Sequence, residues 1–180
     1  MGGYSQTGTG RDMARLTCPN CGKLLVEPSG RPSSKILFLG EFPGFQEIEE
    51  NAPWVGPAGD VFKRELQRAG IVYGTCRATN LWLHGVDTKT CEFKWHLEQA
   101  FKELQGKEAV LLIGSEVSKY LLEKPVSEVS GLKVTAPLLP KEIKLAVACF
   151  NPAMATKGEG VGEVRLAIER FAEWSREYRD

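Results

Sequence analysis

The sequence has no excess charge of either sign and no long hydrophobic run. It contains 23 basic and 23 acidic residues, so its net charge is zero, and it lacks the basic excess of many strong nucleic-acid binders. Any contact with DNA must therefore depend on local basic groups and helix N-termini. No apolar segment is long enough to span a bilayer, and residues 1–12 have no apolar segment typical of a secretory signal. We expect a cytoplasmic protein without membrane contact.

Two nucleotide-binding fingerprints are also missing, because the chain has neither a G-x-x-x-x-G-K-S/T loop nor a G-x-G-x-x-G sequence. The five Cys are an odd number, and in a cytoplasmic protein they should be reduced or bound to metal. The 180 residues suit one domain with a substantial core. We expect residues 1–14 to form a disordered tail and residues 15–180 to form one domain with an N-terminal metal-binding segment.

Short apolar segments alternate with amphipathic segments along the chain. The pattern predicts strands at 35–40, 77–83, 108–114 and 143–150, a small strand at 132–136, and helices at 56–71, 91–106, 115–124 and 162–179. This alternation is typical of an α/β fold with a mostly parallel four-stranded sheet covered on both faces. Ligands bind beyond the carboxyl ends of such strands, so the segments that follow the four strands should converge on one cleft.

One stretch, FLGEFPGFQEIEENAPWVGPAG from Phe38 to Gly59, stands out from this pattern. It is too rich in Gly and Pro for a helix and too long for a turn, so we expect a long loop. Loops of this length are uncommon in compact domains and are usually functional.

This stretch resembles the first motif of family-four uracil-DNA glycosylases, in which a strand runs into Gly-Glu-Ala-Pro-Gly, an acidic stretch, Pro-Phe-Val-Gly and Ala-Gly. TNLWLHG (79–85) and VLLIGSEVSKYLL (110–122) resemble later family segments, and NPAMA (151–155) stands where the family has His-Pro-Ser. The resemblance covers residues 15 to 175 and implies a three-layer α/β/α sandwich. The first-motif matches keep the family spacing without a gap: Gly40, Glu41, Pro43, Gly44, Glu47, Pro53, Val55, Gly56, Ala58 and Gly59.

The resemblance implies a DNA glycosylase that flips a pyrimidine-type base out of DNA and hydrolyses its N-glycosidic bond, leaving an abasic site. By it, Glu41 orients the attacking water and Trp54, in the family's Phe position, stacks on the base. Asn80 reads the base edge, since an amide both donates and accepts hydrogen bonds. Gly40 belongs to the same base-binding loop. That motif has no Lys, so a Schiff-base lyase step is not indicated.

The resemblance also implies that the segment after the last strand faces the sugar and enters the minor groove. Asn151 begins this segment as a third catalytic residue. Met154 is expected to act as an apolar wedge that fills the gap left by the flipped nucleotide. Lys157 is expected to contact a phosphate.

Three residues concern the choice of base. Asn151 replaces the family's His, which stabilises negative charge on the base, and loss of one such donor costs about 10²–10³ in rate. Gly44, as in family four, leaves the pyrimidine 5-position unblocked, and Phe42 replaces the family's Ala in the pocket wall. The substrate is therefore left open between uracil and a modified pyrimidine.

The sequence CPNCGK places Cys18 and Cys21 in a C-x-x-C pair, which is half of a zinc site. Family four binds a 4Fe-4S cluster through an N-terminal Cys pair and two later Cys. Here His84 stands at the third family position, and Cys91 is nearest the fourth. These four residues are the predicted ligands of a structural metal, either zinc or a 4Fe-4S cluster.

The remaining soft side chains have lesser roles in this prediction. His96 and Cys76 are reserve ligands, although burial in the core is the favoured interpretation for Cys76 and for Cys149, which lies in an apolar strand.

Two alternative functions remain open. One is a glycosylase dedicated to the hypermodified pyrimidines of phage DNA, which would serve antiviral defence. The other is a non-catalytic DNA-binding module derived from a glycosylase, which the Asn at position 151 keeps open. In each case we expect DNA as the partner and a monomeric protein.

Overall fold

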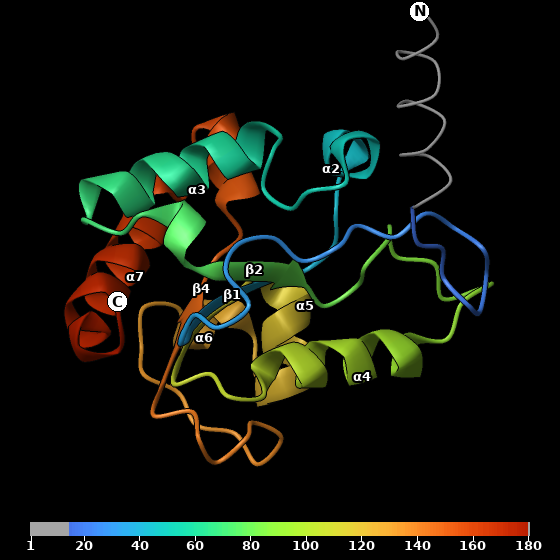
Figure 1. Cartoon of the computed structure of the whole chain (residues 1–180). Coiled ribbons are helices and arrows are strands. Elements are labelled where there is room, and N and C mark those ends of the chain that lie inside the picture. Colours follow the sequence, from blue (N-terminus) through green and yellow to red (C-terminus); the bar gives the residue numbers. More distant parts are fainter. Residues whose placement is uncertain (1–14, 180) are drawn as a thin grey trace, which may run out of the picture.

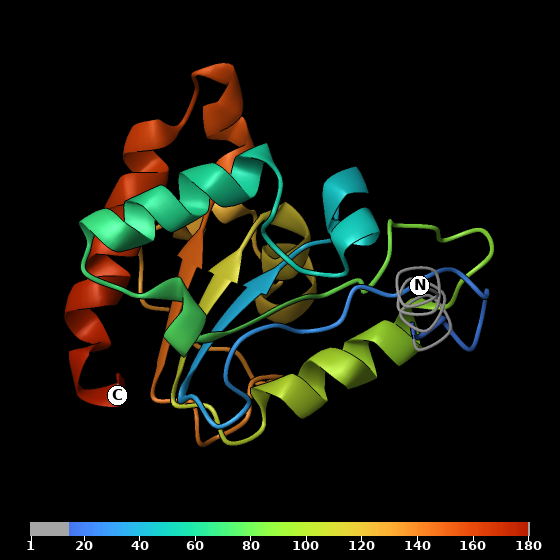
Figure 2. The same ribbon diagram turned by 45° about the horizontal axis from the view of Figure 1, so that its top comes forward.

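A computed structural model describes residues 15–179. Its centre is a sheet of four strands, β1 (Ile36–Gly40), β2 (Arg77–Asn80), β3 (Ala109–Ile113) and β4 (Leu145–Cys149). The strand order is β2-β1-β3-β4, and every neighbouring pair is parallel. The carboxyl ends of the strands therefore meet at one edge of the sheet (Figure 2).

Helices connect the strands and cover both faces of the sheet (Figure 1). In chain order the helices are α2 (Phe45–Glu50), α3 (Pro57–Arg68), η1 (Tyr73–Thr75), α4 (Phe93–Leu104), α5 (Ser115–Val117), η2 (Ser118–Leu122), α6 (Val126–Val129), η3 (Pro152–Lys157), α7 (Val161–Trp174) and η4 (Arg176–Tyr178). Of these, η1, η3 and η4 are short 3₁₀-helices, and η2 is a turn of π-helix.

Successive residues of each strand pack into different halves of the core, because side chains alternate across a strand. In β1, Phe38 packs toward α3 and α7, where it meets Phe62 and Phe171. Leu37 and its counterpart Leu39 belong to the other half, with side chains from α4, η2 and α6. The predicted three-layer α/β/α sandwich is confirmed, and the sheet is parallel throughout.

Several predicted boundaries differ from the structure. The stretch predicted as a continuous loop contains the six-residue helix α2, so that prediction was wrong. Gly44 is the N-cap residue of α2, and the carboxylate of Glu47 accepts a hydrogen bond from the Gly44 N–H at 3.0 Å. This capping arrangement gives the Gly44 N–H a hydrogen-bond acceptor that it would otherwise lack. A short helix can therefore form among glycines and prolines.

The other differences are smaller. The strand predicted at 77–83 ends at Asn80, after which the chain turns toward the N-terminal segment. The small strand predicted at 132–136 is only an isolated bridge between Lys133 and Val147. The helix predicted at 115–124 divides into α5 and η2.

Residues 15–35 run beside the segment that follows β2 (Figures 1 and 2). The Val26 N–H donates to the Leu83 carbonyl at 2.7 Å, and Ser29 exchanges two backbone hydrogen bonds with Ala78. The N-terminal segment is thereby attached to β2 and to the loop after it. The tail predicted at residues 1–14 lies outside the described residues. Among residues 15–179, no helix has the length and apolar character needed to cross a membrane.

Candidate active site and metal centre

A pocket of about 230 Å³ opens at the carboxyl edge of the sheet. Residues from the ends of β1, β2 and β4 reach it, as the convergence of strand ends predicts. It is lined by Glu41, Phe42, Gly44, Glu47, Trp54, Gly56, Pro57, Ala58, Gly59, Asn80, Asn151 and Ala153.

Glu41 follows β1 directly and is only 8% exposed. The Asn151 side-chain amide donates to its Oε1 at 2.8 Å, while the Glu116 N–H and the Ser115 hydroxyl donate to its Oε2 at 2.9 and 3.3 Å. Gly114 makes this approach possible, because a Cβ on Gly114 would lie 2.2 Å from the Glu41 carboxylate carbon. The carboxylate is thus fixed by the chain that leaves β3 and by the chain that leaves β4.

Asn80 is the last residue of β2 and pairs in register with Gly40 of β1. A Cβ on Gly40 would lie 2.5 Å from the Asn80 Oδ1 and 2.8 Å from Cζ2 of Trp54. Only glycine at position 40 therefore lets both the amide of Asn80 and the indole of Trp54 pack against the backbone of β1.

Trp54 belongs both to the core and to the pocket wall. Its indole packs on Phe62 with ring centroids 4.6 Å apart, and the Trp54 backbone has a left-handed φ of 59°. Gly59 lies against that backbone, since a Cβ on Gly59 would be 2.1 Å from the Trp54 carbonyl oxygen. The ring is rigidly placed, which suits a surface on which a base stacks.

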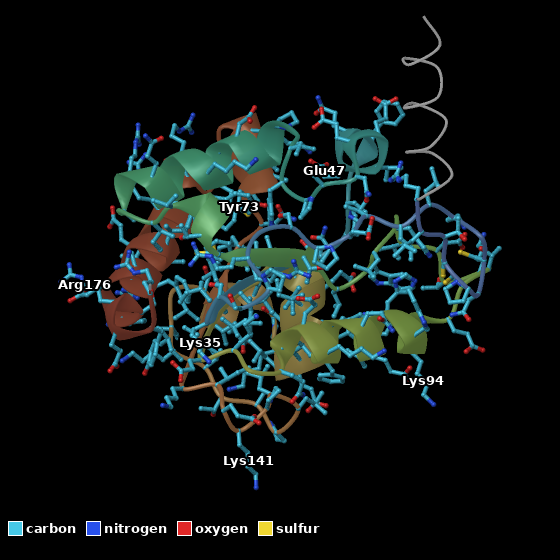
Figure 3. All side chains as sticks on the ribbon, in the orientation of Figure 1. Lys35, Glu47, Tyr73, Lys94, Lys141 and Arg176 are labelled. Atoms are coloured by element: carbon cyan, nitrogen blue, oxygen red, sulfur yellow. The ribbon has the colours of Figure 1, made fainter. Side chains whose placement is uncertain are left out.

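Glu47 has a structural role that the sequence analysis missed. Besides the Gly44 N–H, its carboxylate accepts hydrogen bonds from the backbone N–H groups of Val55 and Gly56. Figure 3 shows Glu47 between α2 and the chain that leads to α3, whereas Lys94, Lys141 and Arg176 project outward. The Gly-x-x-Glu spacing from Gly44 to Glu47 is typical of a helix N-terminus and could have predicted this role.

Phe42 lies at the pocket rim and is 46% exposed. Gly44 lies at the same side, and a Cβ there would be 2.8 Å from the Glu47 Oε1. The two predicted wall residues thus line the pocket together, and Phe42 adds an apolar side chain at its rim.

Asn151 caps η3, because its Oδ1 accepts the Ala153 N–H at 2.9 Å while its amide nitrogen donates to Glu41. Met154 and Lys157 follow on η3. The Met154 side chain folds toward Gly160, whose Cβ would lie 2.9 Å from the Met154 Cε, and Lys157 is exposed. This short helix extends from the pocket to the surface.

A second cluster lies between the N-terminal segment, the loop after β2 and the start of α4. Cys18, His84, Cys91 and His96 are buried, and their ligand atoms all lie within 4.8 Å of one another. The Cys21 Sγ lies 3.3 Å from the His84 Nε2. Thiolate sulfur and imidazole nitrogen are ligands of zinc and of iron–sulfur centres. This cluster could hold a metal.

The reserve candidates divide clearly between the cluster and the core. His96 is fully buried in the cluster, and its Nε2 lies 3.4 Å from the Cys91 Sγ. Cys76 and Cys149 lie instead in the half of the core covered by α3 and α7. Burial in the core was the favoured interpretation for both residues. Burial and the neighbouring His84 lower the pKa of His96 to about 4, so this imidazole is neutral at physiological pH.

The fold and the pocket define an α/β protein with a pocket at the carboxyl ends of parallel strands. Residues 27–171 match the family described as the uracil DNA glycosylase superfamily, and the chain belongs to that superfamily. Membership supports a DNA glycosylase acting on uracil-type bases, with DNA as its substrate. His84, Cys91 and His96 lie within the matched residues, whereas Cys18 and Cys21 precede them.

Proposed function

We propose that the protein is a monofunctional DNA glycosylase of the family-four type, which hydrolyses the N-glycosidic bond of a flipped pyrimidine-type base. The observation that carries the proposal is the fixed position of the Glu41 carboxylate at the pocket floor, beside Asn80 and Asn151. Cleavage makes the sugar cation-like and the base anion-like. A carboxylate stabilises the first charge, and amide donors stabilise the second.

Glu41 can also orient the attacking water. A carboxylate has about four acceptor sites, and the hydrogen bonds from Asn151, Glu116 and Ser115 occupy three of them. The fourth is left for a water molecule on the pocket side. Asn80 supplies both a donor and an acceptor for the base edge, and Trp54 supplies the stacking surface.

η3 supports the proposed contact with DNA, because it joins the pocket to the protein surface. We propose that Met154 leaves its position against Gly160 and enters the base stack as the base flips out. Lys157, in the last turn of η3, contacts a backbone phosphate.

The test is one cleavage screen followed by single-turnover rates. Oligonucleotides with uracil, mismatches or modified pyrimidines are incubated with the protein, and abasic sites are read by alkaline cleavage. On the best substrate, Glu41→Ala and Asn80→Ala should each lose on the order of 10²-fold or more while still binding DNA. Glu50→Ala is the matched control, since Glu50 is an exposed carboxylate on α2. Unchanged rates in both pocket variants would favour a non-catalytic DNA-binding module.

A second candidate substrate is a modified pyrimidine, including the hypermodified bases of phage DNA. Asn151 favours it, because it replaces the family's His and has only one N–H left for a base: its amide nitrogen already donates to Glu41, and its Oδ1 accepts from the Ala153 N–H. Asn151→His should then gain uracil activity and lose activity on the native base. A loss on both substrates would contradict this specificity role.

We also propose that the Cys/His cluster binds a structural metal, with Cys18, Cys21, His84 and Cys91 as the ligands and either zinc or a 4Fe-4S cluster as the occupant. The donor set fits both, because it combines thiols with imidazoles in a buried site. The metal would join residues 15–35 to the loop after β2 and would take no part in the cleavage step. Elemental analysis of anaerobically purified protein should give about one zinc or about four irons per chain.

A further inference from the structure

The cluster contains one more soft side chain than a metal centre of either proposed kind requires. Cys18, Cys21, His84, Cys91 and His96 offer three sulfurs and two nitrogens. A structural zinc ion or a 4Fe-4S cluster takes four protein ligands. Backbone contacts of the two imidazoles show which ring has a lone pair available for a metal.

His84 presents an unprotonated nitrogen to the cluster. Its Nδ1 lies 2.7 Å from the carbonyl oxygen of Gly85. A carbonyl only accepts hydrogen bonds, so Nδ1 carries the proton. In a neutral imidazole the other nitrogen then has a free lone pair. That atom, Nε2, lies 3.3 Å from the Cys21 Sγ and 3.1 Å from the His96 Nε2.

His96 has the opposite tautomer. The backbone N–H of Leu83 donates to its Nδ1 at 3.0 Å, so Nδ1 must be the unprotonated nitrogen. Nε2 therefore carries the proton, and its nearest neighbour is the unprotonated His84 Nε2 at 3.1 Å. Once a metal takes the lone pair of the His84 Nε2, the acceptors left for this proton are the Cys91 Sγ at 3.4 Å and the Cys18 Sγ at 3.9 Å. A neutral His96 could bind a metal through Nε2 only if the fully buried ring gave up its bond with Leu83, leaving a buried backbone donor without its partner.

We infer that His96 is a positioning residue and not a ligand: its Nε2–H donates to the Cys91 thiolate, and His84 is the single nitrogen ligand beside Cys18, Cys21 and Cys91. The inference rests on the proposed metal centre and not on glycosylase activity. Trp82 and Trp95 hold the His96 ring, with centroids 4.8 and 5.0 Å from it.

In this arrangement the backbone of residues 83–85 sets the tautomers of both imidazoles. Its N–H at Leu83 makes one imidazole a hydrogen-bond donor, and its carbonyl at Gly85 makes the other imidazole a ligand. A hydrogen bond to a ligating thiolate withdraws charge from the sulfur, and such contacts tune metal affinity and redox potential. His96 would therefore set the properties of the centre without touching the metal.

The test compares His96→Gln with His84→Gln in protein carrying the metal with which it is purified. The amide of Gln can accept from the Leu83 N–H and donate to sulfur, but its nitrogen has no lone pair for a metal. X-ray absorption at a zinc edge should give three sulfurs and one nitrogen in the wild type and in His96→Gln. If the metal is iron, pulsed EPR of the reduced cluster should detect one imidazole nitrogen in both proteins. His84→Gln should lose that nitrogen.

A third variant, His96→Leu, removes the donor. It should weaken metal affinity about 10–100-fold without changing the ratio of sulfur to nitrogen, and His96→Gln should restore most of the loss. Two nitrogens in the wild type, or loss of a nitrogen in His96→Gln, would overturn this inference alone. Protein that binds neither zinc nor iron would overturn the metal centre and this inference with it, whereas a folded, metal-bound protein without activity would leave both standing.

Discussion

At the scale of single residues, the pocket depends on glycines that leave room for the side chains of the candidate site. Gly114 has φ 104° and ψ 165°, a backbone region that is essentially restricted to glycine. Gly40 and Gly59 instead admit Asn80 and Trp54. The position of the Glu41 carboxylate therefore depends on the missing Cβ of Gly114, and this dependence can be tested.

Gly114→Ala should displace the Glu41 carboxylate and destabilise the fold. We expect a loss of about 1–3 kcal/mol in the free energy of unfolding from backbone strain, and a large loss of cleavage rate, measured by thermal unfolding and single-turnover assays. Gly106→Ala is the matched control: Gly106 also has a positive φ, 76°, but nothing lies within 4 Å of its Cβ position. Equal effects of the two variants on the cleavage rate would show that Glu41 does not depend on Gly114.

At the scale of elements, α2 and the chain leading to α3 form one wall of the pocket, and Glu47 holds the two together. Glu47→Ala leaves the backbone N–H groups of Gly44, Val55 and Gly56 without their charged acceptor. We expect a loss of about 1.5–3 kcal/mol in stability and faster hydrogen exchange at Val55 and Gly56. Glu49→Ala, an exposed neighbour, should leave exchange unchanged. Protection retained in Glu47→Ala would mean that the wall is held by packing.

η3 is the element on which the proposed DNA contacts lie. Met154→Ala should reduce the cleavage rate on duplex DNA more than on single strands, because only a duplex has a stack for an apolar side chain to enter. Lys157→Ala should reduce the salt dependence of DNA binding by about one unit of slope. Both are measured on the best substrate of the screen. Equal losses on duplex and single strands would remove the wedge role of Met154.

At the scale of the whole molecule, the proposed metal joins parts of the chain that are far apart in sequence. A chelator should lower the melting temperature by at least about 5 °C, since 1 kcal/mol corresponds to about 2–4 °C for a chain of this size. In Cys18→Ser the melting temperature should already be low, and the chelator should lower it little further. A chelator effect of the same size in both proteins would mean that the metal binds elsewhere.

Most of the fold could be predicted because its strands are short apolar runs separated by amphipathic helices. The convergence of Glu41, Asn80 and Asn151 followed from the geometry of a parallel sheet. α2 could not be predicted from composition, since its six residues depend on a local contact between Glu47 and Gly44. The proposed role of His96 could not be predicted either, because its tautomer is set by the backbone of Leu83, thirteen residues earlier in the chain.

The N-terminal segment also has a consequence for solubility. β2 stands at one edge of the sheet, and an uncovered edge strand offers its backbone groups to other chains. Ser29 covers part of that edge through its paired hydrogen bonds with Ala78, at 2.9 and 3.0 Å. The same segment carries Cys18 and Cys21, so loss of the proposed metal centre should loosen the segment that covers β2. We expect such a loss to appear as self-association through the sheet edge.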